Sequence, residues 1–266
     1  MRRVRTAVVG HVEWVEFVRL PHWPAAGEII HATDLWSEPA GGGAVVARQL
    51  ALLAGRCELF TAFGEDDAGR SAVRRLAELG VDVHVQHPWR STTRRAWTQI
   101  DDRGERTIIV LGDKLLPRGS LPLEDYDLVF FISGDAAALR AARRARYLAA
   151  TLREQGTLHE AGVPIDLLIG SANDPGEQYD GSLDAGLVVI TDGPNGGTAN
   201  GEPFAAVEPR GPVVDTYGAG DSFAAALAFA LARGDALAHA LDLAARAGAA
   251  VLTGRGPYTS QLAFGQ

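Results

Sequence analysis

The residues best suited to chemistry lie in segment 215–221, where the chain reads Asp-Thr-Tyr-Gly-Ala-Gly-Asp. The apolar residues before this segment predict a short strand that ends at Asp215, and the alanine-rich residues after it predict a helix that begins at Asp221. The backbone N–H groups of Gly218, Ala219 and Gly220 are then unpaired donors at the positive end of a helix dipole, which makes an anion site. A carboxylate beside an anion site suits phosphoryl transfer to a hydroxyl group, because it can act as general base.

A simple helix cap, a dinucleotide-binding turn and a Walker loop all fit this segment less well. A helix cap at Asp221 does not need the glycines that precede it. A dinucleotide-binding turn reads G-x-G-x-x-G, whereas this chain has Phe223 at the last glycine position. The Walker sequence G-x-x-x-x-G-K-[ST] is absent, and Lys114 is the only lysine of the chain. The segment therefore favours a kinase without a Walker lysine.

Segment 215–221 matches without departure the D-T-x-G-A-G-D signature of the ribokinase-like, or PfkB, family of small-molecule kinases. The chain resembles this family over nearly its whole length. The resemblance implies transfer of the γ-phosphate of ATP to a hydroxyl group of a sugar, polyol or nucleoside, with Mg²⁺ as cofactor, Asp221 as the base and Thr216 beside the nucleotide. Two alternatives stay open: a nucleotide-binding regulator of the same fold that has lost acceptor phosphorylation and, less favoured, an NAD(P)-dependent oxidoreductase.

Two further segments resemble the nucleotide site of the family. Thr191, Gly193 and Gly196 follow a predicted buried strand and match its T-x-G-x-x-G turn, which implies contact with the ATP phosphates. Without the resemblance, this segment is simply a tight turn. Gly248 lies in the last predicted helix, in the region that borders the adenine in the family, although helix packing accounts for this glycine equally well.

Asp174 and Glu177 resemble the family's N-x-x-E element, which helps to hold Mg²⁺ through water. Mg²⁺ keeps several of its waters when bound, so carboxylates in this place make chemical sense. Because Asp174 stands where the family has Asn, the sequence leaves open whether Asn173 or Asp174 is the functional residue, and a solvated turn is the structural alternative. Some relatives hold a monovalent cation, such as K⁺, beside the anion site, and Asp215 would contribute to it.

The acceptor site combines one match with two departures from the family pattern. A glycine motif whose backbone approaches the acceptor in the family is matched by Gly41, Gly42 and Gly43. The family's acceptor-binding Asp and Asn are replaced by Val15 and Val45, respectively. We expect Glu13 to supply the missing carboxylate, because residues two apart on a strand face the same side. If the register slips by one residue, Glu16 takes this place.

Composition limits the partners. A net charge of −8 argues against nucleic acid, and no apolar run approaches the length of a membrane span. The single cysteine, Cys57, excludes an internal disulfide and indicates a reducing, cytoplasmic setting. The basic and then apolar start of the chain is more typical of a strand than of a signal peptide. The expected partners are therefore ATP and a small hydroxyl compound.

The predicted elements indicate the fold class. Short apolar strands, such as 128–132, 165–169 and 187–191, alternate with helices, including one predicted over 136–154. This alternation predicts a mostly parallel sheet covered on both faces, a three-layer α/β/α sandwich. The half-exposed strands of segments 12–35 and 94–111 do not fit the alternation, and the resemblance assigns them to a small β lid over the acceptor site. The whole chain, 1–266, then forms one ribokinase-like domain. Because lids pair between protomers in relatives, we also expect a homodimer through the lid.

Overall fold

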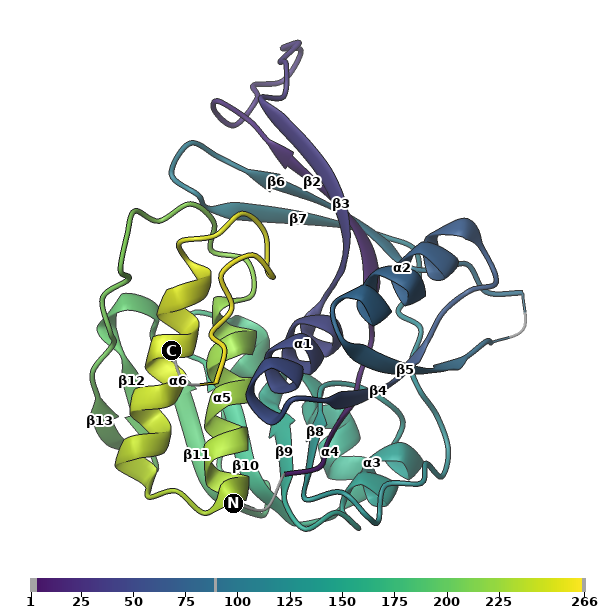
Figure 1. Cartoon of the computed structure of the whole chain (residues 1–266), viewed down its shortest axis with the longest axis vertical. Coiled ribbons are helices and arrows are strands. Elements are labelled where there is room, and N and C mark those ends of the chain that lie inside the picture. The colour runs from purple at the N-terminus through teal and green to yellow at the C-terminus, as the bar shows by residue number, and fades with distance from the viewer. Residues whose placement is uncertain (1–3, 89, 265–266) are drawn as a thin grey trace.

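The computed structural model describes residues 4–88 and 90–264. A nine-stranded sheet forms the centre of the molecule, with the strand order β13-β12-β11-β10-β9-β8-β1-β4-β5 (Figure 1). From β11 to β5 all neighbouring strands are parallel, whereas β12 and β13 continue one edge in antiparallel pairing. The strands are β1 Thr6–Val9, β4 Cys57–Ala62, β5 Val81–Gln86, β8 Leu128–Phe131, β9 Leu148–Thr151, β10 Ile165–Ser171, β11 Ala185–Thr191, β12 Gly197–Ala199 and β13 Glu202–Phe204.

Helices cover both faces of this sheet, which confirms the predicted three-layer sandwich. One face is packed by α1 Gly42–Ala54, α2 Asp67–Glu78, α5 Ala219–Arg233 and α6 Leu237–Val251. The other is packed by α3 Ala136–Ala142 and α4 Gln155–Ala161. Short 3₁₀ turns follow three strands, at Leu152–Glu154, Pro175–Glu177 and Gly193–Asn195. Among the described residues, no helix is both long and apolar enough to cross a membrane.

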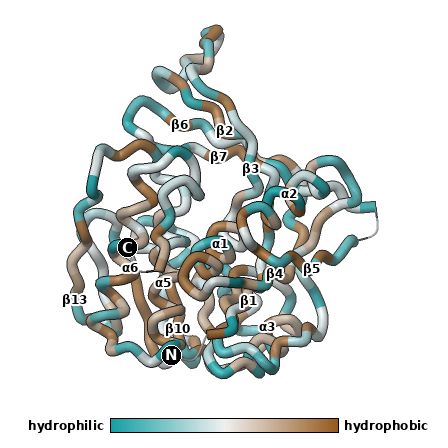
Figure 2. The backbone as a smooth tube through the Cα atoms, viewed as in Figure 1, coloured by the Kyte–Doolittle hydropathy of each residue, from teal (hydrophilic) through white to brown (hydrophobic). Residues whose placement is uncertain are grey.

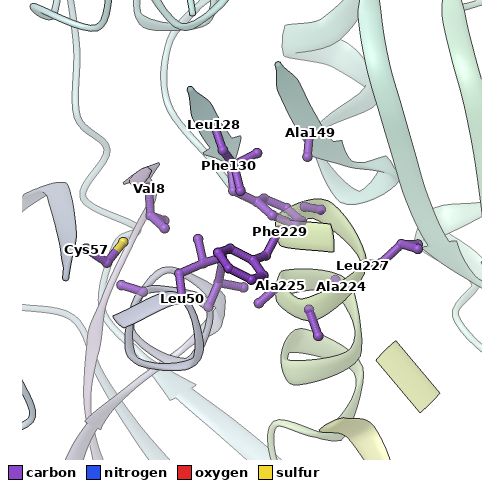
Figure 3. Packing of buried hydrophobic residues seen from close by; sticks show 14 of the residues in the cluster. Val8, Leu50, Cys57, Leu128, Phe130, Ala149, Ala224, Ala225, Leu227 and Phe229 are labelled. Carbon is purple, nitrogen blue, oxygen red and sulfur yellow. The ribbon is translucent and has the colours of Figure 1, made fainter. Parts of the chain in front are cut away.

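The larger core lies between the sheet and the pair α1 and α5. Figure 3 shows Leu50 of α1 and Phe229 of α5 meeting Phe130 of β8, all of them buried. The small residues of α5, seen as Ala224 and Ala225 in this view, let the helices approach closely. Burial of apolar area in this layer is the main favourable contribution to folding.

A second, four-stranded sheet forms a lid that projects from the body (Figure 1). Its strand order is β3-β2-β6-β7, with β2 and β6 parallel and the outer pairs antiparallel. The strands are β2 Glu13–Arg19, β3 Asp34–Ala40, β6 Arg95–Ile100 and β7 Arg106–Leu111. Hydrophobic residues continue from the body into these strands (Figure 2), and Val15, Phe17 and Tyr217 belong to one buried cluster that joins the lid to the body.

Three predictions of local structure are wrong. Segment 136–154 is not one helix, because α3 ends at Ala142 and Leu148–Thr151 forms the buried strand β9 between β8 and β10. Sheet pairing there overrides the helix propensity of an alanine-rich sequence. The second lid strand begins at Asp34 rather than near residue 28, because its register against β2 pairs Asp34 with Arg19. The short strand predicted to end at Asp215 does not form, although the Val214 N–H donates to the Leu252 carbonyl over 2.7 Å.

Replacement of a buried leucine should measure the importance of the α1–α5 layer. Leu50 is fully buried, so Leu50→Ala should cost about 2–5 kcal/mol of unfolding free energy through lost transfer energy and the cavity left behind. Leu237→Ala is the control, because Leu237 is 39% exposed and its loss should cost less than about 1 kcal/mol. Urea unfolding of both variants checks this, and equal midpoints would contradict it.

Candidate active site

The predicted anion turn forms at the first residues of α5. Gly218 is the N-cap with φ 86°, and no side chain caps the helix. The first N–H groups of a helix have no intrahelical acceptor, so Ala219 and Gly220 present free donors. A methyl group at Gly218 would lie 3.0 Å from Val45 Cγ1, whereas one at Gly220 would meet nothing within 4 Å. Gly218 is therefore needed for its positive φ, and the open space of the turn lies over Gly220.

Asp221 stands in the first turn of α5 and is partly buried. Burial raises the pKa of this carboxyl to about 6; Arg106 opposes the rise, and Glu177 adds to it. A methyl group placed on Gly42 would lie only 3.2 Å from Asp221 Oδ1. A carboxyl with a pKa near neutrality, beside an anion turn, is suited to act as a general base.

The glycine run lies against the carboxyl end of β1. It lies between Asp221 and a pair of polar side chains, His11 and Glu13, which we call the polar corner. A methyl group on Gly41 would lie 3.4 Å from the His11 ring and 3.7 Å from Glu13 Cγ. One on Gly43 would lie 2.5 Å from the His11 carbonyl oxygen. Glycine is required at position 43 by this approach, and at position 41 by a φ of 87°. Gly41, Gly42 and Gly43 thus form a floor between this corner and Asp221.

Glu13 and Glu16 lie on opposite faces of β2. Glu13 shares the buried face with Val15, and its Oε1 lies 3.2 Å from Arg94 Nε. Burial raises the pKa of Glu13, while Arg94 and Lys114 oppose the rise. Glu16 pairs instead with Arg95 on the exposed face. The register that the sequence favoured is the one the structure has, and Glu16 is remote from the glycine floor.

The two valines that replace polar family residues are used for packing. Val15 and Val45 are fully buried in one cluster with Phe17, Tyr217 and Tyr258. This cluster holds the lid against the start of α1. Because these positions have no polar atoms, any polar contact to an acceptor on this side comes from neighbours such as Glu13.

Asp215 is buried and satisfied by backbone donors. Its carboxylate accepts the N–H of Tyr217 over 2.8 Å and the N–H of Gly256 over 3.0 Å, and burial raises its pKa. The hydroxyl of Tyr217 in turn accepts the N–H of Gly41 over 3.0 Å. The segment before the anion turn is thereby tied to the glycine floor. A role of Asp215 toward K⁺ stays a prediction.

The turn of the lid hairpin docks on Thr216. The carbonyl of Gly104 accepts both the N–H and the hydroxyl of Thr216, each over 3.2 Å. Arg106 donates to the Thr216 carbonyl over 2.7 Å and lies with its guanidinium 5.5 Å from the Tyr217 ring centre. Sequence reasoning missed Arg106, because an arginine at the start of a hairpin strand has no distinguishing pattern.

Asp174 and Glu177 lie together after β10, and Arg153 pairs with both. Asp174 also accepts the Gly176 N–H over 2.9 Å, so its oxygens are largely occupied. Glu177 accepts the Ser171 N–H over 2.9 Å and is close enough to Asp221 to raise its pKa. In the described part of the chain, no three histidine, cysteine or acidic side chains are grouped to hold a metal ion. Both carboxylates meet a backbone N–H and Arg153, but of the two only Glu177 acts on Asp221, so Glu177 is the better candidate for a contact to Mg²⁺ through water.

The predicted nucleotide turn ends β11 at the carboxyl edge of the sheet. Thr191 Oγ1 donates to the Gly170 carbonyl over 3.2 Å, and Gly193 and Gly196 have φ of 53° and 88°. Next to it, Asn173 Nδ2 donates to Asp192 Oδ1 over 3.1 Å and so joins this turn to the Asp174 segment. Gly248 is buried in the contact between α6 and α5, where an added methyl group would lie 3.3 Å from the Ala219 carbonyl. Helix packing alone accounts for Gly248, and its contact with a nucleotide stays a prediction.

Comparison with known proteins decides the family. The sequence profile described as pfkB family carbohydrate kinase matches residues 5–153 and 159–263. The chain belongs to the pfkB family. A relative named ATP-dependent ribose-1-phosphate kinase, from Halopiger xanaduensis, is 29% identical over 252 residues, which cover 84% of this chain and 83% of the relative.

Solved structures show the same fold. The ribokinase of Thermotoga maritima matches with a TM-score of 0.77 at 21% identity, covering 98% of this chain and 96% of the other. The ribokinase of Arabidopsis thaliana, solved with ribose and ATP, matches with a TM-score of 0.75, also at 21% identity and with the same coverages of 98% and 96%. The predicted ribokinase-like fold is therefore confirmed.

Family membership makes the chain a phosphotransferase with an alcohol group as acceptor and ATP as donor. This confirms the prediction of a kinase, and the comparisons give no support to the oxidoreductase. The comparisons give no support to a regulator that lacks acceptor phosphorylation.

Asp221→Asn should cut kcat by about 10²–10⁴-fold and leave ATP binding nearly unchanged, because an amide cannot take the acceptor proton. The base works only when ionised. In the wild type, where the pKa of Asp221 is about 6, kcat/KM for the acceptor should therefore be constant above that pH and fall about tenfold per pH unit below it.

Arg106→Gln is the matched test of this assignment. It removes the cation that lowers the pKa of Asp221, so the fall of kcat/KM at low pH should begin at a higher pH than in the wild type. Rate profiles of the wild type and of Arg106→Gln between pH 5 and 8 make the measurement. An Asp221→Asn enzyme that keeps more than about a tenth of wild-type turnover, measured where chemistry limits the rate, would exclude Asp221 as the base.

Proposed function

We propose that the chain transfers the γ-phosphate of ATP to a hydroxyl group of a ribosyl compound, with ribose 1-phosphate as the first candidate. The observation that carries the proposal is Asp221, a carboxyl with a pKa of about 6 between the anion turn and the glycine floor. The acceptor class is supported by the relative named ATP-dependent ribose-1-phosphate kinase.

In the proposed reaction, the acceptor lies on the glycine floor with its reacting hydroxyl at Asp221. Asp221 takes the proton as the hydroxyl oxygen bonds to the γ-phosphorus and the bond to the leaving ADP oxygen breaks. The N–H groups of Gly218, Ala219 and Gly220 stabilise the charge on the transferring group, because they point at it from a helix N-terminus. The lid excludes water, which limits hydrolysis of ATP.

Mg²⁺ would neutralise charge on the ATP phosphates, with Glu177 holding it through water. Arg153, which pairs with Glu177 and Asp174, would keep that carboxylate oriented. Thr191, Gly193 and Thr216 lie at the same edge of the molecule and are proposed to contact the nucleotide.

Positive charge near the acceptor corner favours an anionic acceptor. Lys114, Arg94 and Arg153 all act on His11 and lower its pKa. The Lys114 ammonium is paired with Glu154 and is partly exposed, so a phosphate group can exchange for that partner. A ribose that carries a phosphate would therefore bind better here than free ribose.

Release of ADP from ATP and Mg²⁺ tests this function directly. Ribose 1-phosphate should give a kcat/KM at least about tenfold above that of ribose or a ribonucleoside, which corresponds to one charge-assisted contact. Lys114→Gln should reduce this preference, whereas Arg118→Gln, at an exposed position outside the corner, should not. ATP binding without turnover on every acceptor would overturn the proposal.

The lid also favours a homodimer. Strand β7 is one of the two edge strands of the lid sheet, and Ile108, Ile109, Val110 and Leu111 on it are 41–49% exposed. Successive residues of a strand face opposite sides, so both faces of this edge are apolar. Edge strands of monomers are normally protected by charges or by cover. We therefore propose that the lid of a second copy covers β7.

Ile109→Lys should convert the dimer to a monomer in sedimentation experiments, because it places a charge in the proposed contact. Val207→Lys is the control, since Val207 is also exposed but lies outside the lid. A wild-type protein that sediments as a monomer, or equal behaviour of the two variants, would exclude this interface.

A further inference from the structure

His11 is an unassigned side chain beside the glycine floor. It follows β1 and is mostly buried, with its side chain 16% exposed. Its Nε2 lies 3.8 Å from Glu13 Oε1, and a methyl group on Gly41 would lie 3.4 Å from the same nitrogen. His11 therefore lies at the polar corner, across Gly41 and Gly42 from Asp221.

Ser133 determines which ring nitrogen of His11 carries the proton. The Ser133 Oγ accepts the backbone N–H of His11 over 2.9 Å and also lies 2.9 Å from Nδ1 of the ring. Ser133 is fully buried, and no other acceptor within the described ranges lies at hydrogen-bond distance from its hydroxyl. A buried hydroxyl hydrogen without an acceptor is costly, so Ser133 donates to Nδ1. The proton of a neutral His11 is then on Nε2, on the side of Glu13.

The surroundings keep the ring neutral. Burial lowers the pKa of His11 well below its ordinary value, and Lys114, Arg94 and Arg153 lower it further. Glu13 Oε1 lies 3.8 Å from His11 Nε2, and the charge of Glu13 is partly met by Arg94. The corner thus presents one N–H donor next to one carboxylate acceptor.

A donor and an acceptor at this separation match a hydroxyl group, which both donates and accepts. A hydroxyl oxygen can lie at about 2.8 Å from both His11 Nε2 and Glu13 Oε1. The corner is separated from Asp221 by the floor of Gly41 and Gly42, and consecutive Cα atoms are about 3.8 Å apart. A methyl group on Gly41 would contact the His11 ring and one on Gly42 would contact Asp221, so a single small acceptor that lies on these two glycines can reach both the corner and Asp221.

We propose that His11 is a specificity-determining residue for the acceptor, whose Nε2–H donates to the ring hydroxyl that donates to Glu13. Together, His11 and Glu13 replace the polar contacts that Val15 and Val45 cannot make. This inference rests on the proposed function, because it assigns a partner to a hydroxyl of the proposed ribosyl acceptor.

Kinetics on deoxy acceptors test the assignment. Wild type should lose at least about tenfold in kcat/KM on either 2-deoxyribose 1-phosphate or 3-deoxyribose 1-phosphate, relative to ribose 1-phosphate. His11→Ala should lose a similar factor on ribose 1-phosphate, through KM, and lose nothing further on that deoxy acceptor, since the partner is already missing. His11→Gln, which keeps an N–H donor, should recover most of the loss. The KM for ATP should not move.

Two measurements separate this role from a structural one. The control His84→Gln changes a histidine that stacks on Phe60 and pairs with Glu58. It should leave kcat/KM unchanged on both ribose 1-phosphate and the deoxy acceptor. Nitrogen-15 spectra of His11 in the free enzyme should show the neutral tautomer protonated on Nε2 between pH 6 and 8, and Ser133→Ala should remove this preference.

Each contrary result has a distinct meaning. Equal losses of the His11→Ala variant on both ribose 1-phosphate and the deoxy acceptor, or a resonance protonated on Nδ1, would overturn the role of His11 while the kinase assignment stands. A wild-type enzyme that phosphorylates no ribosyl compound would overturn the proposed function, and the role of His11 with it.

Discussion

The contact between the first turns of α1 and α5 is the constraint on which this site depends. Both helices begin at a glycine with a positive φ, 87° at Gly41 and 86° at Gly218, and neither has a side-chain cap. The Tyr217 hydroxyl and the Gly41 N–H join the two starts. Two uncapped helix N-termini at one edge of a parallel sheet concentrate N–H donors where a phosphate can bind, and a side chain at position 42 would crowd the Asp221 carboxylate, because its Cβ would lie 3.2 Å from Oδ1.

The lid acts on this centre through charge as well as shape. Arg106 reaches over the anion turn, bonds to the Thr216 carbonyl and lowers the pKa of Asp221, which burial has raised. If Asp221 is the base, as we propose, its carboxyl must be ionised near neutral pH but still basic enough to take a proton. A pKa of about 6 meets both requirements, because burial and Glu177 raise the pKa of Asp221 and one lid arginine lowers it.

The two valines show how packing and recognition compete for the same positions. Val15 and Val45 lie in the buried cluster that holds the lid strands against α1, so these side chains stabilise the fold by burying apolar surface. In the site we propose, polar recognition of the acceptor falls to residues around them, the acid Glu13 and the imidazole of His11. A buried carboxylate and an imidazole are suited to hydroxyl groups, because together they supply both an acceptor and a donor.

The sequence by itself determined the family, the alternation of strands and helices, and the residues of the anion turn, because each depends on neighbours along the chain. Only the tertiary structure decided that residues 148–151 form a strand, since that requires β8 and β10 on either side. It also decided the roles open to Arg106, His11 and Ser133, which lie far apart in the sequence. The partners of these residues and the tautomer of His11 depend on burial and on groups from other elements, and local spacing along the chain encodes neither.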